Sequence, residues 1–140
     1  METLENSKTY ALLNLTENDI AKHVFECAMQ IHKDLGPGLL ENVYLECLAF
    51  KLYKKGFMIE KQKVVPIVFE EMRIESGFRI DIHIENKLIV EVKSVDALQD
   101  IHAAQMLTYL KLTGNKLGLI INFNTVLLKD GYKRVINGYL

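Results

Sequence analysis

Residues 78–94, FRIDIHIENKLIVEVKS, contain two apolar runs in which polar residues alternate with apolar ones. Alternation with a period of two is typical of β-strands, because successive side chains of a strand point to opposite faces of the sheet. The pattern predicts two strands, residues 78–84 and 88–93, that pair as an antiparallel hairpin. Any fold of this chain has to bury the apolar face of that hairpin.

The apolar face also predicts the register of the hairpin. A three-residue turn over residues 85–87 unites the apolar residues on one face, in the pairs Ile84–Leu88, Ile82–Val90 and Ile80–Val92. The same register sets Asp81 opposite Glu91 and Arg79 opposite Lys93. A two-residue turn would instead set Asp81 opposite an apolar residue and mix both faces, which a buried face penalises. We therefore expect Asp81 and Glu91 to be cross-strand neighbours, with Lys93 on the same face.

Two opposed carboxylates destabilise a sheet unless something of opposite charge lies between them. A divalent cation fits there, because hard cations bind carboxylate oxygens and waters. Lys93 would then lie beside the ion, within reach of a phosphate oxygen or an attacking water. The alternative is a surface network in which Arg79 and Lys93 neutralise the pair, and the hairpin alone favours neither interpretation.

Helical spacing and turn residues predict three helices. The first begins at a capping-box-like pair, Thr16 and Asp19, and stops at Gly36-Pro37-Gly38. The second covers about residues 40–55, with Gly56 as its C′ residue. The third runs from Asp96 to about residue 113 and is closed by a glycine.

The remaining segments predict further strands. Residues 58–70 are extended, and Pro66 within them indicates a sheet edge or a bulge. Residues 116–123 are almost continuously apolar, as in a strand buried on both faces. Residues 126–136 predict a short terminal strand pair. The order is ααβββαβ(β), an α/β (α+β) fold with helices packed on a mixed sheet, formed by one domain over residues 16–140 after a loosely attached leader, residues 1–15.

Composition bounds the function only loosely. A net charge of −1 neither supports nor excludes nucleic acid, which generally binds a basic surface. Cys27 and Cys47 lie in helical patterns without metal-ligand spacing, so we expect two reduced core thiols. The first ten residues lack the apolar core of a signal peptide, and no run is long enough to span a membrane, so we expect a cytoplasmic protein.

Two polar patterns lie on the predicted helices. In GLLENVY, Gly38, Glu41 and Tyr44 are spaced three apart at the start of the second helix, although the helix dipole alone would favour a carboxylate there. In HAAQMLTYLK, one polar stripe lies on an otherwise apolar helix and is formed by His102, Gln105 and Tyr109. This stripe would cover the carboxylate pair, unless it is a solvent-exposed face.

The order of these residues along the chain resembles the PD-(D/E)XK nuclease superfamily. The stretch from Ile20 to Phe123 looks like its GxxExxY branch, because GLLENVY, EVKSV, HAAQMLTYL and GLIINF all match. Ile80-Asp81 replaces the hallmark Pro-Asp and leaves the carboxylate in place. The resemblance implies a restriction-endonuclease-like αβββαβ core.

The resemblance further implies a Mg²⁺- or Mn²⁺-dependent phosphodiesterase acting on nucleic acid, with DNA favoured. Asp81 and Glu91 would ligate the metal, and Lys93 would orient the attacking water or steady the phosphate. Glu41 would complete the shell through water or a second ion, and Gln105 would support the lysine or the phosphate. Tyr44, His102 and Tyr109 are expected only to line the site, His102 through a hydrogen bond on its helix.

Two alternatives to an enzyme are left open. A binding or assembly module could keep the nuclease fold without turnover, which the small size and the absence of net positive charge favour. A structural subunit of a homo-oligomer would use the apolar C-terminal strands. Against both alternatives, a chain without catalysis has no need to hold two opposed carboxylates and a lysine on one face.

Overall fold

A single mixed sheet organises the computed structural model, which describes residues 15–140; the expected leader lies outside the described residues except for Leu15. The strand order is β1-β2-β3-β4-β5, and only β3 and β4 pair in parallel. The elements follow one another as α2 (Glu17–Leu35), α3 (Glu41–Lys54), β1 (Ile59–Phe69), β2 (Met72–Ile84), β3 (Leu88–Lys93), α4 (Asp100–Thr113), β4 (Leu117–Asn122), the 3₁₀ helix η1 (Leu128–Gly131) and β5 (Tyr132–Ile136). The predicted fold class is confirmed.

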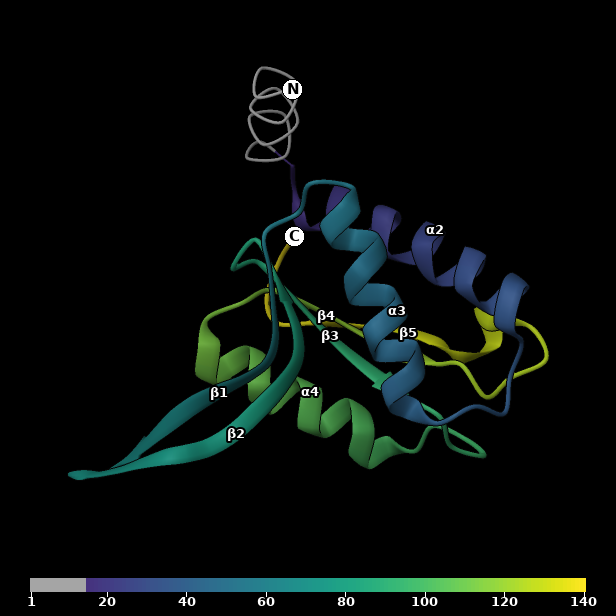
Figure 1. Cartoon of the computed structure of the whole chain (residues 1–140). Helices are drawn as coiled ribbons and strands as arrows, with labels where there is room; N and C mark the ends of the chain where they lie inside the picture. Colours follow the sequence, from purple (N-terminus) through teal and green to yellow (C-terminus); the bar gives the residue numbers. More distant parts are fainter. Residues whose placement is uncertain (1–14) are drawn as a thin grey trace, which may run out of the picture.

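The sheet lies between two layers of helix (Figure 1). Helices α2 and α3 cover one face, where the core includes Val90 and Val92 of β3. Helix α4 covers the other face, where Ile89 and Ile120 pack with Met106. Gly118 of β4 permits this close packing, because a Cβ atom there would overlap the Met106 side chain. The central strands β3 and β4 are therefore buried on both faces, as the apolar run in β4 predicted.

The helix boundaries follow the local signals in the sequence. The Thr16 hydroxyl accepts a hydrogen bond from the Asp19 nitrogen at 3.2 Å, and the Asp19 carboxylate accepts one from the Thr16 nitrogen at 3.0 Å. This is the predicted capping box. Helix α2 ends at Gly36, with φ of 73°, and the turn after α3 uses Gly56, with φ of 97°. Both glycines adopt a backbone conformation that other residues rarely take.

Strand β2 is longer than predicted, because it begins at Met72 instead of residue 78. With β1 it forms a long hairpin that projects beyond the rest of the molecule (Figure 1). Its turn uses Glu70 at φ of 56° and contains no glycine, so the sequence lacks the usual turn signal. The expectation for Pro66 is confirmed, because β1 is an edge strand and its register with β2 shifts between Val65 and Ile67.

Two other boundaries differ from prediction. Helix α4 begins at Asp100 instead of Asp96, because hydrogen bonds hold the preceding segment in a non-helical path. Residues 126–136 form a 3₁₀ helix and one strand instead of a strand pair. The apolar run there reflects one buried residue, Leu128, since Val126 and Leu127 are exposed. Within residues 15–140 no helix has the length and apolar character needed to cross a membrane.

Candidate active site

The β2–β3 hairpin has the predicted three-residue turn. Ile84 pairs with Leu88 and Ile82 pairs with Val90, so the two-residue turn is excluded. The turn is closed by a hydrogen bond from the Lys87 nitrogen to the Ile84 carbonyl at 2.9 Å, and residues 85 and 86 have φ of 52° and 55°. His83 therefore lies on the face that α4 covers, as do Glu91 and Lys93, which alternate in register with Ile89.

The two strands diverge immediately beyond the Ile82–Val90 pair. There the Asp81 carboxylate, instead of a main-chain carbonyl of β2, accepts a hydrogen bond from the Val92 nitrogen at 2.9 Å. The Asp81 nitrogen in turn donates to Glu91 Oε1 at 3.4 Å. Asp81 and Glu91 are thus neighbours across the hairpin, and Lys93 follows Glu91 on the same face of β3.

The outer pairs of the predicted register do not form. Ile80 packs in the cluster beneath α4 and does not share a face with Val92. Arg79 does not oppose Lys93, because its guanidinium donates to Gln62 Oε1 on β1 at 3.4 Å. Gln62 has φ of 53°, which twists β1 beside Asp81. The predicted all-apolar face was therefore wrong at Ile80, since it assumed an undisturbed strand.

Glu91 is buried, with 6% of its surface exposed. Burial, and next the negative charge of Asp81, raise the pKa of Glu91 to about 9, while Lys93 acts in the opposite direction. At neutral pH the metal-free pair therefore holds an extra proton. The pKa of Tyr109 is also raised, first by burial and then by the charges of Glu91 and Asp81. The Tyr109 ring stacks on Phe78 at 4.4 Å.

A surface salt-bridge network does not form around the carboxylates. Between the residues that the structure describes, the ion pairs are Lys55–Glu26, Lys61–Glu46, Lys63–Glu60 and Arg73–Glu75. Neither Arg79 nor Lys93 takes part in them. The alternative in which these two cations neutralise Asp81 and Glu91 is therefore not supported.

The segment after Lys93 is held on two sides. The Ser94 hydroxyl donates to the Leu39 carbonyl at 2.7 Å, which joins the end of β3 to the turn before α3. On the other side, the Asn122 side chain accepts from the Val95 nitrogen and donates to the Val95 carbonyl, both at 3.0 Å. These bonds fix the position of the chain at the end of the strand that carries Glu91 and Lys93.

The tyrosine of GLLENVY has a structural role. Tyr44 is fully buried and its ring stacks on Phe123 at 4.5 Å. Its hydroxyl donates to the Gly36 carbonyl at 2.6 Å and accepts from the Leu39 nitrogen at 3.0 Å. Tyr44 therefore shapes the turn that Ser94 contacts and does not present its hydroxyl to a substrate.

Glu41 is exposed at the first residue of α3. The bond between Leu39 and Ser94 attaches this end of α3 to the end of β3. Within residues 15–140, however, no three acidic, histidine or cysteine side chains converge as a ligand set for a metal ion. Glu41 is therefore not grouped with Asp81 and Glu91 as a direct third ligand, and its predicted role through water or a second ion stays a prediction.

The stripe on α4 divides into different environments. His102 Nδ1 accepts a hydrogen bond from the Gln99 nitrogen at 2.9 Å, so the histidine caps the start of the helix. Gln105 is exposed and forms no side-chain hydrogen bond with the described part of the chain. Tyr109 is half-buried and stacks on Phe78, and its pKa is raised by burial and next by the charges of Glu91 and Asp81. The predicted roles of His102 and Gln105 at the site stay predictions.

Sequence reasoning missed two residues near this site. Asn122 ends the apolar strand β4 and pairs with Lys93 in the parallel register, where it anchors Val95. His83 is buried between Lys63, at 3.1 Å from its Nδ1, and Asn115, at 2.7 Å from its Nε2. A lysine only donates, so Nδ1 accepts and Nε2 carries the proton. Asn122 was visible as a polar position in an otherwise apolar strand, whereas His83 was hidden among the alternating polar residues of β2.

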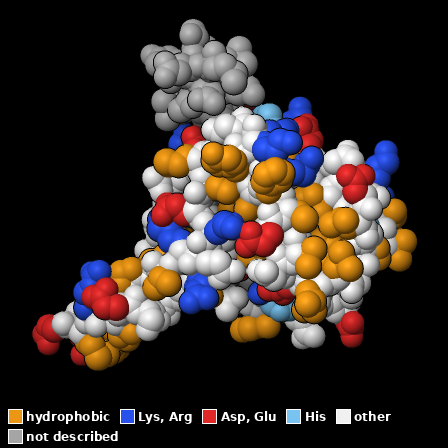
Figure 2. Space-filling view, viewed as in Figure 1, with side chains coloured by type: hydrophobic (Ala, Val, Ile, Leu, Met, Phe, Trp, Pro, Cys, Tyr) orange, Lys and Arg blue, Asp and Glu red, His pale blue; other side chains and the backbone are white. Residues whose placement is uncertain are grey.

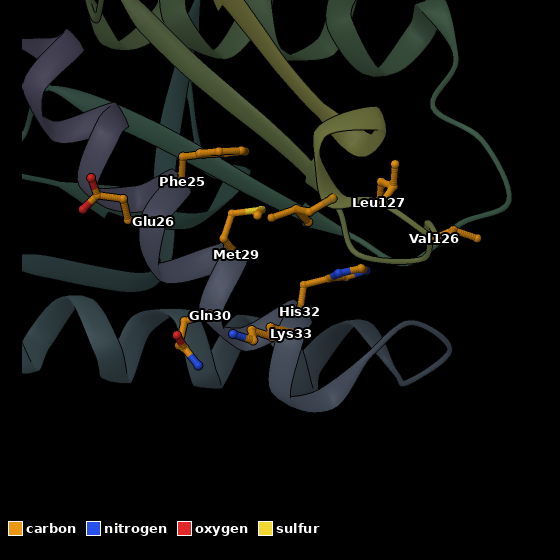
Figure 3. A pocket seen from close by; sticks show the side chains of 9 residues that line it. Phe25, Glu26, Met29, Gln30, His32, Lys33, Val126 and Leu127 are labelled. Carbon is orange, nitrogen blue, oxygen red and sulfur yellow. The ribbon is translucent and has the colours of Figure 1, made fainter.

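An apolar pocket of about 400 Å³ lies elsewhere, between α2 and the segment before η1 (Figure 3). Met29 and His32 of α2 point toward Val126 and Leu127 across it. His32 also bonds the Thr125 carbonyl at 2.8 Å, which secures the segment. None of the candidate site residues lines this pocket, and α2 lies on the opposite face of the sheet from α4.

The carboxylate pair fits a magnesium-type ion. Mg²⁺ is usually bound by one or two protein carboxylates together with waters and substrate phosphates, so a third protein ligand is not required. Burial, and next the charge of Asp81, raise the pKa of Glu91, so a second anion at this position is unfavourable without a compensating charge. Asp81 and Glu91 therefore present the oxygen donors and the excess negative charge that such a cation needs.

Comparison with known protein families gave a match. The sequence profile described as PD-(D/E)XK nuclease superfamily matches residues 18–135, which include every element from α2 to β5 except the outermost residues. Neither the search of curated proteins nor the search of solved structures found a match. Since the profile covers most of the sequence, the chain belongs to the PD-(D/E)XK nuclease superfamily.

Proposed function

We propose that the chain is a divalent-cation-dependent phosphodiesterase that cleaves nucleic acid, with DNA as the favoured substrate. The observation that carries the proposal is the pairing of Asp81 with the buried Glu91, which lack an ion-pair partner among the described residues. Two carboxylates without a cationic partner are costly in a sheet that has no use for them. Membership in a nuclease superfamily supports a phosphodiester as the substrate.

In this proposal Asp81 and Glu91 hold Mg²⁺ or Mn²⁺. When bound, the cation would lower the pKa of a coordinated water and offset negative charge on the phosphate. Lys93 lies on the same face, and its ammonium group orients the attacking water or donates to a phosphate oxygen. Glu41 would support the ion through water or a second ion, and Gln105 would support Lys93 or the phosphate.

The local structure supports a precise position for Lys93. Its carbonyl accepts a hydrogen bond from the Phe123 nitrogen at 3.0 Å, and the two following residues are bonded to the α3 turn and to Asn122. A catalytic group needs such a rigid support, because small displacements from the reactive geometry reduce the rate strongly.

We also infer that the chain belongs to the GxxExxY branch of the superfamily, on the evidence of Gly38, Glu41 and Tyr44.

The test is a cleavage assay with labelled single-stranded, duplex and branched DNA and with RNA, each in Mg²⁺, Mn²⁺ and EDTA. We expect the wild-type chain to cut at least one DNA substrate in Mn²⁺ and none in EDTA. Asp81→Asn should be inactive, whereas Asp130→Asn, an exposed aspartate of η1, serves as the matched control and should cut normally. If the wild-type chain binds these nucleic acids but cuts none of them, the binding-module alternative replaces the nuclease.

A further inference from the structure

The last residue of β4 is a buried asparagine. Asn122 is 2% exposed, although the rest of β4 consists of apolar residues and one glycine. A buried amide is costly unless its polar atoms have hydrogen-bond partners. In the parallel register Asn122 lies beside Lys93, the last residue of β3. The partners of the Asn122 side chain therefore indicate what it does at this end of the sheet.

Both polar atoms of the Asn122 amide bind the main chain of Val95. The Oδ1 atom accepts a hydrogen bond from the Val95 nitrogen at 3.0 Å, and the Nδ2 atom donates to the Val95 carbonyl at 3.0 Å. Oδ1 also accepts from the Asn124 nitrogen at 3.2 Å. Since main-chain nitrogens only donate, these contacts fix the orientation of the amide. One side chain thus satisfies both main-chain groups of the residue that lies two positions after Lys93.

Side chains hold the end of β3 on both of its edges. Toward β4, the Phe123 nitrogen donates to the Lys93 carbonyl at 3.0 Å, and beyond this bond the Asn122 amide continues the contact. Toward β2, the Asp81 carboxylate accepts from the Val92 nitrogen at 2.9 Å. Each neighbouring strand therefore contributes one polar side chain that fixes the main chain around Lys93.

The position of the Lys93 ammonium group depends on this main chain. Within residues 15–140, Lys93 has no ion-pair partner that would hold its side chain. A lysine side chain is a flexible stem of four carbons and does not keep one position by itself. The region that its ammonium group can reach is therefore set by where the main chain of residues 93–95 lies.

Surface charge does little to align a nucleic acid on one face of the molecule. The Lys and Arg side chains of the described residues lie there among Asp and Glu side chains and form no continuous basic area (Figure 2). The net charge of the whole chain is −1. Because nucleic acid is bound mainly through basic groups at its phosphates, a phosphate at the candidate site relies on single cations such as Lys93. The position of such a cation has to be accurate.

An amide suits the end of β4 better than a carboxylate would. An ionised carboxylate only accepts, so it would face the Val95 carbonyl without a proton to donate. It would also add a third negative charge to the end of the sheet that already carries Asp81 and Glu91. The neutral amide of Asn122 donates and accepts at once, and it leaves the charge of the candidate site unchanged.

We propose that Asn122 is a positioning residue, which holds the ammonium group of Lys93 in place for the phosphate through the main chain of residues 93–95. The inference rests on the proposed function, because it takes the role of Lys93 from there. Asn122 touches neither the cation nor the phosphate and acts only through the segment that it binds. Its removal should therefore slow cleavage and leave the binding of the cation and of the nucleic acid unchanged.

The test compares Asn122→Ala with Asn115→Ala, a matched control at the opposite end of β4. The Asn115 side chain also makes two well-formed contacts, with His83 Nε2 at 2.7 Å and with the Asn86 carbonyl at 2.8 Å, so both variants should lose some stability. In Mn²⁺ we expect Asn122→Ala to lower kcat by about tenfold or more with little change in KM, because small displacements of a catalytic group reduce the rate strongly. Asn115→Ala should cut at the wild-type rate.

A second measurement follows Lys93 without any cleavage. In protein that contains isotope-labelled lysine, the nuclear magnetic resonance signal of the Lys93 Cε atom is assigned by its loss in Lys93→Arg. This signal should move in Asn122→Ala toward the value of a freely exposed lysine and should stay in place in Asn115→Ala. Calorimetry should give the same Mn²⁺ affinity for the wild type and both asparagine variants.

Asn122→Thr serves as the conservative variant, because threonine suits a buried strand and its hydroxyl can keep one of the two bonds to Val95. Its kcat and its Lys93 signal should lie between those of the wild type and Asn122→Ala, and it decides the question if Asn122→Ala does not fold. The proposal is overturned if the folded Asn122 variants leave the Lys93 signal in place or cut at the wild-type rate. It is also overturned if Asn115→Ala lowers kcat as much, which would assign the effect to stability. If the wild type cuts no substrate, the proposed function fails, and the Lys93 signal still decides whether Asn122 holds the lysine.

Discussion

The carboxylate of Asp81 accepts a hydrogen bond from the main-chain nitrogen of Val92 at 2.9 Å, at the point where β2 and β3 separate. This bond takes the place of a main-chain hydrogen bond between the two strands. Asp81 is therefore both a candidate metal ligand and a structural hydrogen-bond acceptor. Substitutions of Asp81 therefore have to be chosen so that the two roles are tested apart.

Asp81→Asn keeps an acceptor for the Val92 nitrogen and removes the charge beside Glu91. At a pH above about 9, where Glu91 has lost its proton, we expect the melting temperature of this variant in EDTA to equal or exceed that of the wild type, because the repulsion between the carboxylates is relieved. Asp81→Ala should instead be destabilised by about 1–3 kcal/mol, because the Val92 donor is left unsatisfied. Thermal denaturation measures both. A marked loss of stability in Asp81→Asn would favour a salt bridge from Arg79 or Lys93.

The stability of the metal-free protein should depend on pH through Glu91. The pKa is about 9 in the folded chain against 4.5 for the unperturbed group, so the folded state binds more protons between these values. Stability contributed by Glu91 is complete below the lower value and is lost as the pH rises through the higher one, with a slope of at most about 1.4 kcal/mol per pH unit. Urea denaturation in EDTA from about pH 6 to pH 9 measures this slope, in a range where ordinary carboxylates no longer titrate.

The Glu91→Gln variant tests whether Glu91 causes this pH dependence of stability. The glutamine is uncharged over the whole range, so the pH dependence should flatten, and the variant should exceed the wild type in stability at the alkaline end. Saturating Mn²⁺ should flatten the wild-type slope as well, because the cation takes the place of the proton. Equal slopes in wild type and Glu91→Gln would contradict the assignment.

Substitutions of Lys93 and substitutions of the carboxylates should have different effects on metal binding and cleavage. Lys93→Ala should bind Mn²⁺ as the wild type does, since an ammonium group is not a ligand, yet lose cleavage by a factor on the order of a hundred or more. Lys93→Arg should rescue poorly, because a planar guanidinium replaces a compact charge. Lys51→Ala, a half-buried lysine on α3, is the control and should cut normally. Cleavage by Lys93→Ala at the wild-type rate would remove the lysine from the mechanism.

Tyr44→Phe should affect stability and leave metal binding intact. The variant keeps the ring stacked on Phe123 but loses the hydroxyl that joins Gly36 to Leu39. We expect a loss of about 0.5–3 kcal/mol in the free energy of unfolding. Mn²⁺ affinity at the carboxylate pair should be unchanged in calorimetric titration. Loss of Mn²⁺ binding in a variant that remains folded would show that Tyr44 lies in the site itself.

Most of the fold was accessible from local patterns, and the errors have identifiable physical causes. The hairpin register followed from the apolar alternation as far as Ile82 and Val90. Ile80 was misplaced because the hydrogen bond from Val92 to Asp81 depends on a side chain, which alternation does not encode. The start of α4 was misplaced because Asn122, far away in sequence, holds Val95.

The candidate site could be predicted from the sequence to a similar extent. The neighbouring positions of Asp81 and Glu91 followed from register, whereas the exposure of Glu41 and the burial of Tyr44 depend on how α3 packs against the sheet. The projecting hairpin could not be predicted from its turn, because Glu70 adopts a positive φ without the glycine that usually marks such a turn. Tertiary packing supplied what single segments of sequence could not.

The most direct measurement of the central claim is a Mn²⁺ titration followed by isothermal calorimetry and by thermal shift. The claim predicts a single class of sites in the wild type, lost in both Asp81→Asn and Glu91→Gln and kept in Asp130→Asn, with a thermal stabilisation that disappears together with binding. Equal binding by all four proteins, or no binding by the wild type, would contradict a metal site at Asp81 and Glu91.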